Sequence, residues 1–78
     1  MTVTVLYFAS LRDAAGVDSE QLPTPESLPA LYAQLQARHG FTLPRERLRV
    51  AVDGAFVDWA ARPRAGAEIA FIPPVSGG

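Results

Sequence analysis

The chain opens with a segment in which polar and apolar residues alternate until every position becomes apolar. This two-residue period over Thr2 to Ala9 predicts a strand. Every second residue from Val3 to Tyr7 would face a core, whereas Leu6 and Phe8 would share the outer face with two threonines. One end of that outer face is therefore apolar, and we expect either another part of the chain or a partner protein to cover it.

A second segment has the periodicity of an amphipathic helix. Its apolar residues recur at the three- and four-residue spacing of one helix face: Leu28, Leu31, Tyr32 and Leu35. Ser27 is placed to cap the amino end, and Gly40 to adopt the left-handed conformation that often ends a helix. His39, the only histidine of the chain, falls in the last turn, which indicates a helix-terminus residue rather than a ligand or a base.

Shorter patterns fill the rest of the chain. One or two helical turns are expected over residues 10–16, with Ser10 at the start. Further short strands are expected over residues 17–22, 48–52, 55–57 and 67–72. Asp53-Gly54 is a strong signal for a two-residue hairpin between the second and third of these strands.

The predicted order is strand, strand, helix, strand, short strand, strand. A single main helix packed across one face of a mixed sheet of four or five strands satisfies this order, which makes the chain an α+β protein. The first and last strands would lie side by side in the middle, because both are apolar on two faces for part of their length. This is the β-grasp, or ubiquitin-like, architecture. We expect it over residues 1–72, followed by an extended, flexible C-terminal tail over residues 73–78.

Composition narrows the possible functions. The chain has 78 residues, of which 49% are hydrophobic and 19% charged, enough for one small domain with its own core. A net charge of -1 argues against binding to nucleic acid or anionic lipid. No apolar run has the length of a membrane span, and no signal peptide is visible, so a cytoplasmic location is expected.

The inventory of reactive side chains is nearly empty. The chain has no cysteine and no lysine, which excludes disulfide scaffolds, iron–sulfur clusters, thiol catalysis and Schiff-base chemistry by its own residues. A lone histidine cannot build a metal site, so no metal is expected. No phosphate-binding loop is present either, and no bound cofactor is expected.

The C-terminal segment is the remaining candidate for chemistry. Pro73-Pro74 stops sheet pairing and fixes an extended stem, and Gly77-Gly78 removes side-chain bulk from the tip. Such a tip can enter a narrow channel and bring the carboxylate of Gly78 to a partner's active site. A carboxylate is a poor electrophile, so an outside enzyme would have to activate it, most simply as an acyl-adenylate made with ATP. The alternative is a frayed terminus without a function.

Several segments together resemble a known family. The opening Val5-Leu6-Tyr7-Phe8-Ala9, followed by Leu11-Arg12-Asp13, the single amphipathic helix, Val50-Ala51-Val52-Asp53-Gly54 and above all the close from Ala67 to Gly78 are similar to the small subunits of molybdopterin synthases. The resemblance covers the whole chain. Its most specific part is Phe71 with Pro73-Pro74-Val75-Ser76 and the terminal glycines.

The resemblance implies a sulfur carrier that is not catalytic alone but acts as the co-substrate subunit of a sulfurtransferase. A ubiquitin-activating-type adenylyltransferase, which uses ATP, would adenylate Gly78, and a persulfide donor would supply sulfur for a thiocarboxylate. The loaded tail, with Gly77 needed for threading, would enter the large synthase subunit. There it would give sulfur to cyclic pyranopterin monophosphate within a heterotetramer.

The expected contact surface follows from the same comparison and from the strand pattern. The residues assigned to partner binding are Leu6, Phe8, Arg12, Phe71, Ile72, Pro73, Pro74, Val75 and Ser76. Arg12 could pair with a carboxylate on a partner or, alternatively, with an acid of its own surface.

Three other functions stay open on the residues alone. The chain could carry sulfur for another pathway, such as thiamine synthesis, cysteine synthesis or tRNA thiolation. It could be a ubiquitin-like modifier that becomes attached to lysines of other proteins. It could also be a non-catalytic interaction module with an incidental tail.

Overall fold

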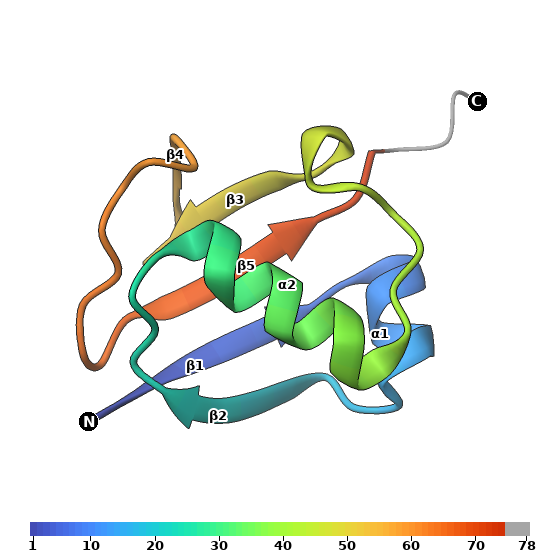
Figure 1. Cartoon of the computed structure of the whole chain (residues 1–78), viewed down its shortest axis with the longest axis horizontal. Coiled ribbons are helices and arrows are strands. Elements are labelled where there is room, and N and C mark those ends of the chain that lie inside the picture. The colour runs from blue at the N-terminus through green and yellow to red at the C-terminus, as the bar shows by residue number, and fades with distance from the viewer. Residues whose placement is uncertain (75–78) are drawn as a thin grey trace.

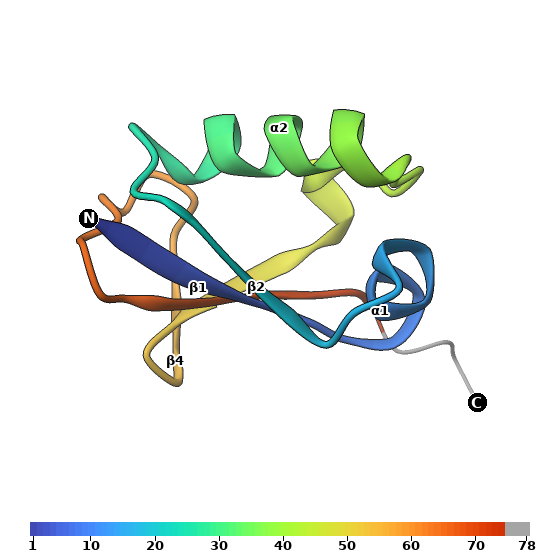
Figure 2. The ribbon, with the colours of Figure 1, turned by 90° about the horizontal axis from the view of Figure 1, so that it is seen from below.

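The protein is built from a mixed sheet with one long helix lying across one face (Figures 1 and 2). The computed structural model describes residues 1–74. Its elements are β1 (Thr2–Tyr7), α1 (Ala9–Ala15), β2 (Ser19–Pro23), α2 (Leu28–His39), the 3-10 turn η1 (Arg45–Arg47), β3 (Arg49–Val52), β4 (Ala55–Val57) and β5 (Glu68–Ile72). Seen edge-on, α2 lies above the sheet, and none of the described residues forms a helix beneath it (Figure 2).

The sheet has five strands in the order β2-β1-β5-β3-β4. β1 and β5 are parallel neighbours, with Leu6 opposite Ala70, and all other pairs are antiparallel. The first and last strands therefore lie side by side in the centre of the sheet, as the sequence predicts. This arrangement confirms the β-grasp fold.

Helix α2 forms where its pattern predicts and for the expected reasons. The side chain of Ser27 accepts a hydrogen bond from the amide of Ala30, and a proline occupies the first turn, where its missing N–H costs nothing. At the other end, Gly40 adopts φ 73° and donates its N–H to the carbonyl of Gln36. The apolar face of the helix is buried against the sheet, as expected for Leu28, Leu31, Tyr32 and Leu35.

The core lies between α2 and the inner face of the sheet. Alternate residues of the two central strands are buried there: Val3, Val5, Tyr7, Ile69 and Phe71. Trp59 closes one side, because its ring stacks on Phe71 at a centroid distance of 5.6 Å and meets Tyr32 edge-on at 6.1 Å. The inner face is therefore fully used by packing.

The hairpin between β3 and β4 is the predicted Asp-Gly turn. Asp53 has φ 51° and Gly54 φ 86°, the two positive values that a type I′ turn requires. Asp53 also bonds β5: its amide donates to the carbonyl of Glu68 at 2.8 Å, and its Oδ1 accepts from the amide of Glu68 at 2.9 Å. This residue therefore both turns the hairpin and extends the pairing of β3 with β5.

The ends of several elements differ from the expectation. β1 ends at Tyr7 rather than Ala9, and β3 and β5 begin at Arg49 and Glu68, each one residue later than expected. α1 begins at Ala9 and not at Ser10, and its N-cap is Phe8, which has no side-chain oxygen to offer. Ala9 adopts φ 50°, so the chain turns abruptly from β1 into the helix. β2 begins at Ser19 rather than Val17 and includes Pro23, which an edge strand tolerates because one side makes no ladder bonds.

Candidate functional site

The root of the predicted tail is held by the centre of the sheet. β5 lies between β1 and β3 and ends at Ile72, after which Pro73 is half-buried and Pro74 exposed. β1 and β5 both run toward α1, so their carboxyl ends lie at the same end of the molecule (Figure 1). The predicted roles of Val75, Ser76, Gly77 and Gly78 lie outside the described residues.

The outer face of the sheet carries an apolar patch that reaches this root. A cross-strand row is formed by residues paired in register on four neighbouring strands, Leu6, Ala70, Ala51 and Phe56. Toward the tail, Ile72 is the last residue of β5, and Phe8 follows the end of β1 as the extended N-cap residue of α1. We call these six residues the outer apolar patch. Phe56 is 56% exposed and Phe8 45%, unusual values for aromatic side chains, and Leu6 and Ile72 are half-buried.

The backbone at Ala9 positions one end of this patch. The carbonyl of Phe8 accepts hydrogen bonds from the amides of Leu11 at 3.1 Å and Arg12 at 3.4 Å, which holds the first turn of α1 against the end of β1. Leu11 can then enter the core while the neighbouring Phe8 stays on the surface. The local turn thus separates a core residue from a surface aromatic.

Two of the residues expected at the interface have other surroundings. Phe71 is completely buried at 0% exposure between Trp59 and Tyr32, so its side chain belongs to the core and the expected partner contact is corrected. Arg12 lies on the surface, with Nε 3.8 Å from Oδ1 of Asp18, and both side chains are largely exposed. Such a surface pair contributes little to stability, so Arg12 can exchange its partner easily.

The sequence reading missed Phe56 as a member of the patch. Phe56 faces outward because it pairs with Ala51, and Ala51 pairs in turn with Ala70 on the outer face of β5. The alternation of inward and outward residues on either side of the Asp53-Gly54 turn is enough to predict that Phe56 faces outward. Membership of one patch, however, depends on the strand order, which places β3 and β4 beside β5.

A polar cluster around Glu20 joins the end of α2 to the edge strand β2, away from the outer apolar patch. Oε1 of Glu20 accepts hydrogen bonds from the Tyr7 hydroxyl and from Nε2 of His39, each at 2.5 Å, and Arg38 approaches Oε2 at 3.5 Å. Burial alone would raise the pKa of Glu20, but the hydrogen bonds from Tyr7 and His39 outweigh it and lower that pKa. Burial also raises the pKa of Tyr7 far above its usual value. His39 is thus a helix-terminus residue with a structural partner, as its position indicates.

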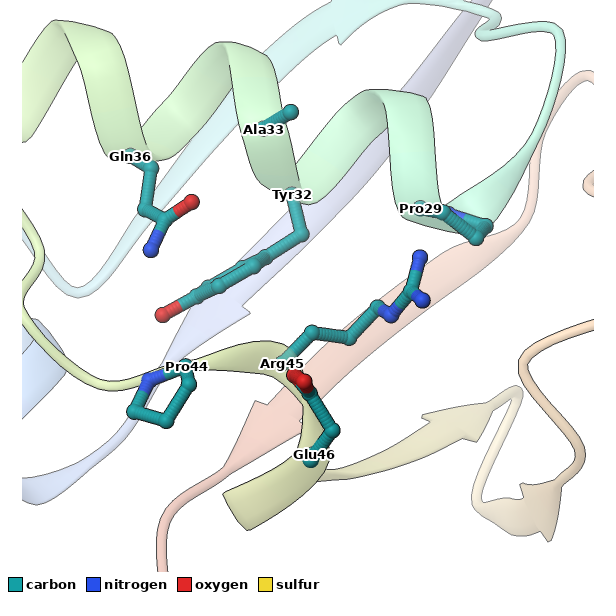
Figure 3. Close-up of a pocket in the computed structure, with 7 residues that line it drawn as sticks. All are labelled: Pro29, Tyr32, Ala33, Gln36, Pro44, Arg45 and Glu46. Atoms are coloured by element: carbon teal, nitrogen blue, oxygen red, sulfur yellow. The ribbon is translucent and has the colours of Figure 1, made fainter.

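A shallow groove between α2 and η1 offers no second active site (Figure 3). It has a volume of about 250 Å³ and is lined by Pro29, Tyr32, Ala33, Gln36, Pro44, Arg45 and Glu46. The Tyr32 hydroxyl and the Gln36 amide both donate to the carbonyl of Leu43, at 2.7 and 3.2 Å, so these polar groups already have partners.

Two further findings concern the same 74 residues. Nowhere in residues 1–74 do three or more histidine or acidic side chains gather as a metal site would need. Neither helix of this part of the chain is long and apolar enough to span a bilayer.

The chain is similar over nearly its full length to proteins named molybdopterin synthase sulfur carrier subunits. It is 35% identical to the molybdopterin synthase sulfur carrier subunit of Haemophilus influenzae, over 97% of this chain and 99% of the relative. It is 37% identical to the subunit of that name from Homo sapiens, over 97% of this chain and 93% of the relative.

A solved structure and a family model agree with these relatives. The complex of subunits 1 and 2 of molybdopterin-converting factor from Helicobacter pylori contains a chain that superposes with a TM-score of 0.71, at 25% identity and with 100% of both chains covered. Residues 5–78 match the model of the ThiS family. Because that match spans nearly the whole chain, from the first strand of the β-grasp through the terminal glycines, the chain belongs to the ThiS family.

Proposed function

We propose that this chain is the sulfur carrier subunit of a molybdopterin synthase, with the sulfur carried on Gly78. The observation that carries the proposal is the identity of 35% and 37%, over nearly the full length, to two proteins that both bear this name. The family match supports it, because it extends to residue 78 and therefore includes the tail.

The chemistry of the chain favours a carrier over an enzyme. The sequence has no cysteine or lysine, and the one histidine donates a hydrogen bond to Glu20. A main-chain carboxylate at Gly78 is then the reactive group. Its oxygen attacks the α-phosphate of ATP within an activating enzyme of the ubiquitin-activating type, which gives an acyl-adenylate and releases pyrophosphate.

Sulfur then replaces AMP on the same carbon. A persulfide donor attacks the carbonyl carbon and expels AMP, and a thiol cleaves the resulting S–S bond, which leaves a thiocarboxylate. The thiocarboxylate transfers its sulfur to cyclic pyranopterin monophosphate in the large subunit, and water restores the carboxylate. None of these steps needs a catalytic side chain on the carrier.

The fold supplies a rigid base for this tail. β5 is hydrogen-bonded on both sides, to β1 and to β3, and its inner-face residues Ile69 and Phe71 are completely buried. The position of Pro73 is therefore fixed by the central strands and not by a loop. A fixed root limits the conformations that the tail loses when it enters a partner, which favours binding.

The large subunit is the partner that we assign to the outer apolar patch. The Helicobacter pylori relative was solved as a complex of subunits 1 and 2. In this chain the patch reaches the root of the tail, so a protein that receives the tail can cover Phe8 and Ile72 at the same time.

Mass spectrometry of the intact protein tests the carrier role. The chain is incubated with its activating enzyme, ATP and a persulfide donor, and we expect the mass increase of one oxygen replaced by sulfur. Deleting Gly78, or adding one residue after it, should abolish the increase while the fold is retained. Sulfur loading that persists in both variants contradicts the role of Gly78.

A reconstituted reaction tests the pathway. The loaded chain is mixed with the large subunit and the pterin precursor, and molybdopterin should form in amounts limited by the thiocarboxylate. In the same assay Phe8→Asp should weaken the complex with the large subunit without unfolding the chain. A loaded chain that binds no large subunit and forms no product would instead serve one of the other sulfur pathways.

A further inference from the structure

We propose that Arg49 is a recognition residue on the outer face, and that it requires a carboxylate on the docking surface of the large subunit. This inference rests on the proposed function, because it concerns the same partner and the same face. It adds a charge requirement to a surface that is otherwise recognised through its apolar side chains.

Arg49 stands on the outer face next to the tail root. It is the first residue of β3 and pairs in register with Ile72, the last residue of β5. The next residue, Val50, points into the core, so the alternation of the strand directs Arg49 to the outer side. Its neighbours there are Ile72 and Phe56 of the outer apolar patch.

The guanidinium of Arg49 is held in place by Phe56. Its central carbon lies 3.9 Å from the centroid of the Phe56 ring, well within the range of a cation–π contact. Stacking on a ring occupies one face of the guanidinium and leaves the N–H groups at its edge available. Because the side chain is already ordered by this contact, a partner loses less entropy when it binds those groups.

Arg49 has no anionic partner within the described residues. The ion pairs formed by residues 1–74 involve Arg12 with Asp18, and Arg38 and His39 with Glu20. The only acid of β5, Glu68, stands at the opposite end of that strand, opposite Thr4. Asp58 follows β4 and lines the same hollow as Arg49, but its Oδ1 accepts a hydrogen bond from the amide of Ala60, and no ion pair joins it to Arg49 within residues 1–74. Strands β1, β3, β4 and β5 place no other charged side chain on the half of the outer face nearest the tail.

Docking would bury this charge together with the patch. A partner that covers Ile72 and Phe56 removes water from the guanidinium between them, and burying an unpaired charge is strongly unfavourable. A carboxylate can accept two parallel N–H bonds from one guanidinium, which satisfies both charge and geometry. An aspartate or glutamate of the large subunit is therefore the group that fits opposite Arg49.

Binding measurements with the full chain and the large subunit test this inference. We expect Arg49→Gln to weaken the complex about tenfold and Arg49→Glu about a hundredfold, in line with close interfacial charge pairs. The affinity of Arg49→Gln should also depend less on salt than that of the unmodified chain. Arg62→Glu is the matched control, because Arg62 is exposed in the loop at the other end of the sheet, and it should change affinity less than threefold (Figure 1).

A double-mutant cycle tests the role of the ring. Phe56→Leu keeps an apolar side chain but removes the surface on which the guanidinium stacks. In that background Arg49→Gln should cost less affinity than it does alone, because Arg49 is no longer ordered beforehand. Thermal unfolding of each variant confirms folding, since both side chains are exposed.

The outcomes separate this inference from the proposed function. If Phe8→Asp abolishes binding while both Arg49 variants bind like the unmodified chain, the carboxylate is excluded and the docking face stands. If Arg49→Glu loses no more affinity than Arg62→Glu, only general charge attraction is present and the inference fails. If the Arg49 variants bind the large subunit normally but load sulfur poorly, Arg49 recognises the activating enzyme and the assignment is wrong.

Discussion

The cluster around Glu20 should be a main determinant of stability. Replacing Glu20 by alanine removes the acceptor of two hydrogen bonds of 2.5 Å, from Tyr7 and from His39. Hydrogen bonds to a charged group contribute about 1.5–3 kcal/mol each, and the lower value applies here because the Glu20 side chain keeps 21% of its exposure. The Arg38 contact, long and half-exposed, adds at most about 0.5 kcal/mol.

These contributions predict a loss of about 3 kcal/mol in the free energy of unfolding for Glu20→Ala. In a domain of this size the melting temperature should fall by more than about 10 °C. Glu20→Gln, which keeps an oxygen acceptor but loses the charge, should cost about half as much. Urea unfolding followed by the fluorescence of Trp59, the only tryptophan, measures both variants.

The pH dependence of the free energy of unfolding shows whether ionised Glu20 stabilises or destabilises the fold. Because the folded state lowers the pKa of Glu20 below its ordinary value of 4.5, the ionised carboxylate stabilises the fold fully above that pH. The stabilisation by ionised Glu20 is lost as the pH falls through the lowered pKa of the folded state. The difference between the unmodified chain and Glu20→Gln should therefore be constant from about pH 7 to pH 5 and shrink below the ordinary pKa.

Glu46→Gln is the matched control for this experiment. Glu46 is exposed in η1 and has no ion pair among the described residues, so the same substitution should change stability by less than about 0.5 kcal/mol at any pH. The reasoning is refuted if Glu20→Gln and Glu46→Gln unfold at the same urea concentration throughout the pH range.

Two further predictions concern backbone geometry. Ala9→Val should destabilise the fold by about 1–2 kcal/mol and weaken partner binding, because a β-branched residue tolerates φ 50° poorly; Ala9→Gly should be as stable as the unmodified chain or slightly more so. A valine variant that keeps full stability would show that the turn relaxes without affecting Phe8. Asp53→Ala should cost about 1–2 kcal/mol and speed hydrogen exchange at the Glu68 amide, which loses its acceptor at 2.9 Å. Unchanged exchange there would mean that this bond contributes nothing.

Most of the fold can be predicted from the sequence because the signals for most helices, strands and turns lie within a few neighbouring residues. The spacing from Leu28 to Leu35 and the glycine at position 40 define α2, and Asp53-Gly54 defines the hairpin, without reference to any distant residue. The start of α1 is the exception. No propensity favours a left-handed alanine at position 9, so the turn there depends on burying Leu11 behind β1.

The candidate site was less accessible to sequence reasoning because it joins distant segments. Leu6 and Phe8 follow from one strand, but Phe56 and Arg49 join them only through the pairing of β3 with β5 and β4. Phe71 shows the opposite problem: similarity to a family marks it as important, while the alternation with Ile69 places it in the core. A motif does not distinguish a residue that contacts a partner from one that supports the contact.

The central position of β5 has a consequence for how the protein is made. Among residues 1–74, β5 is the last strand to leave the ribosome, and it pairs with β1, the first of them, across most of this length. Without β5 the strands on either side have no common neighbour, so the sheet closes only once β5 has been synthesised. A prematurely terminated chain therefore has neither the tail nor the surface that would present it. Products that end before β5 therefore cannot compete for the partner.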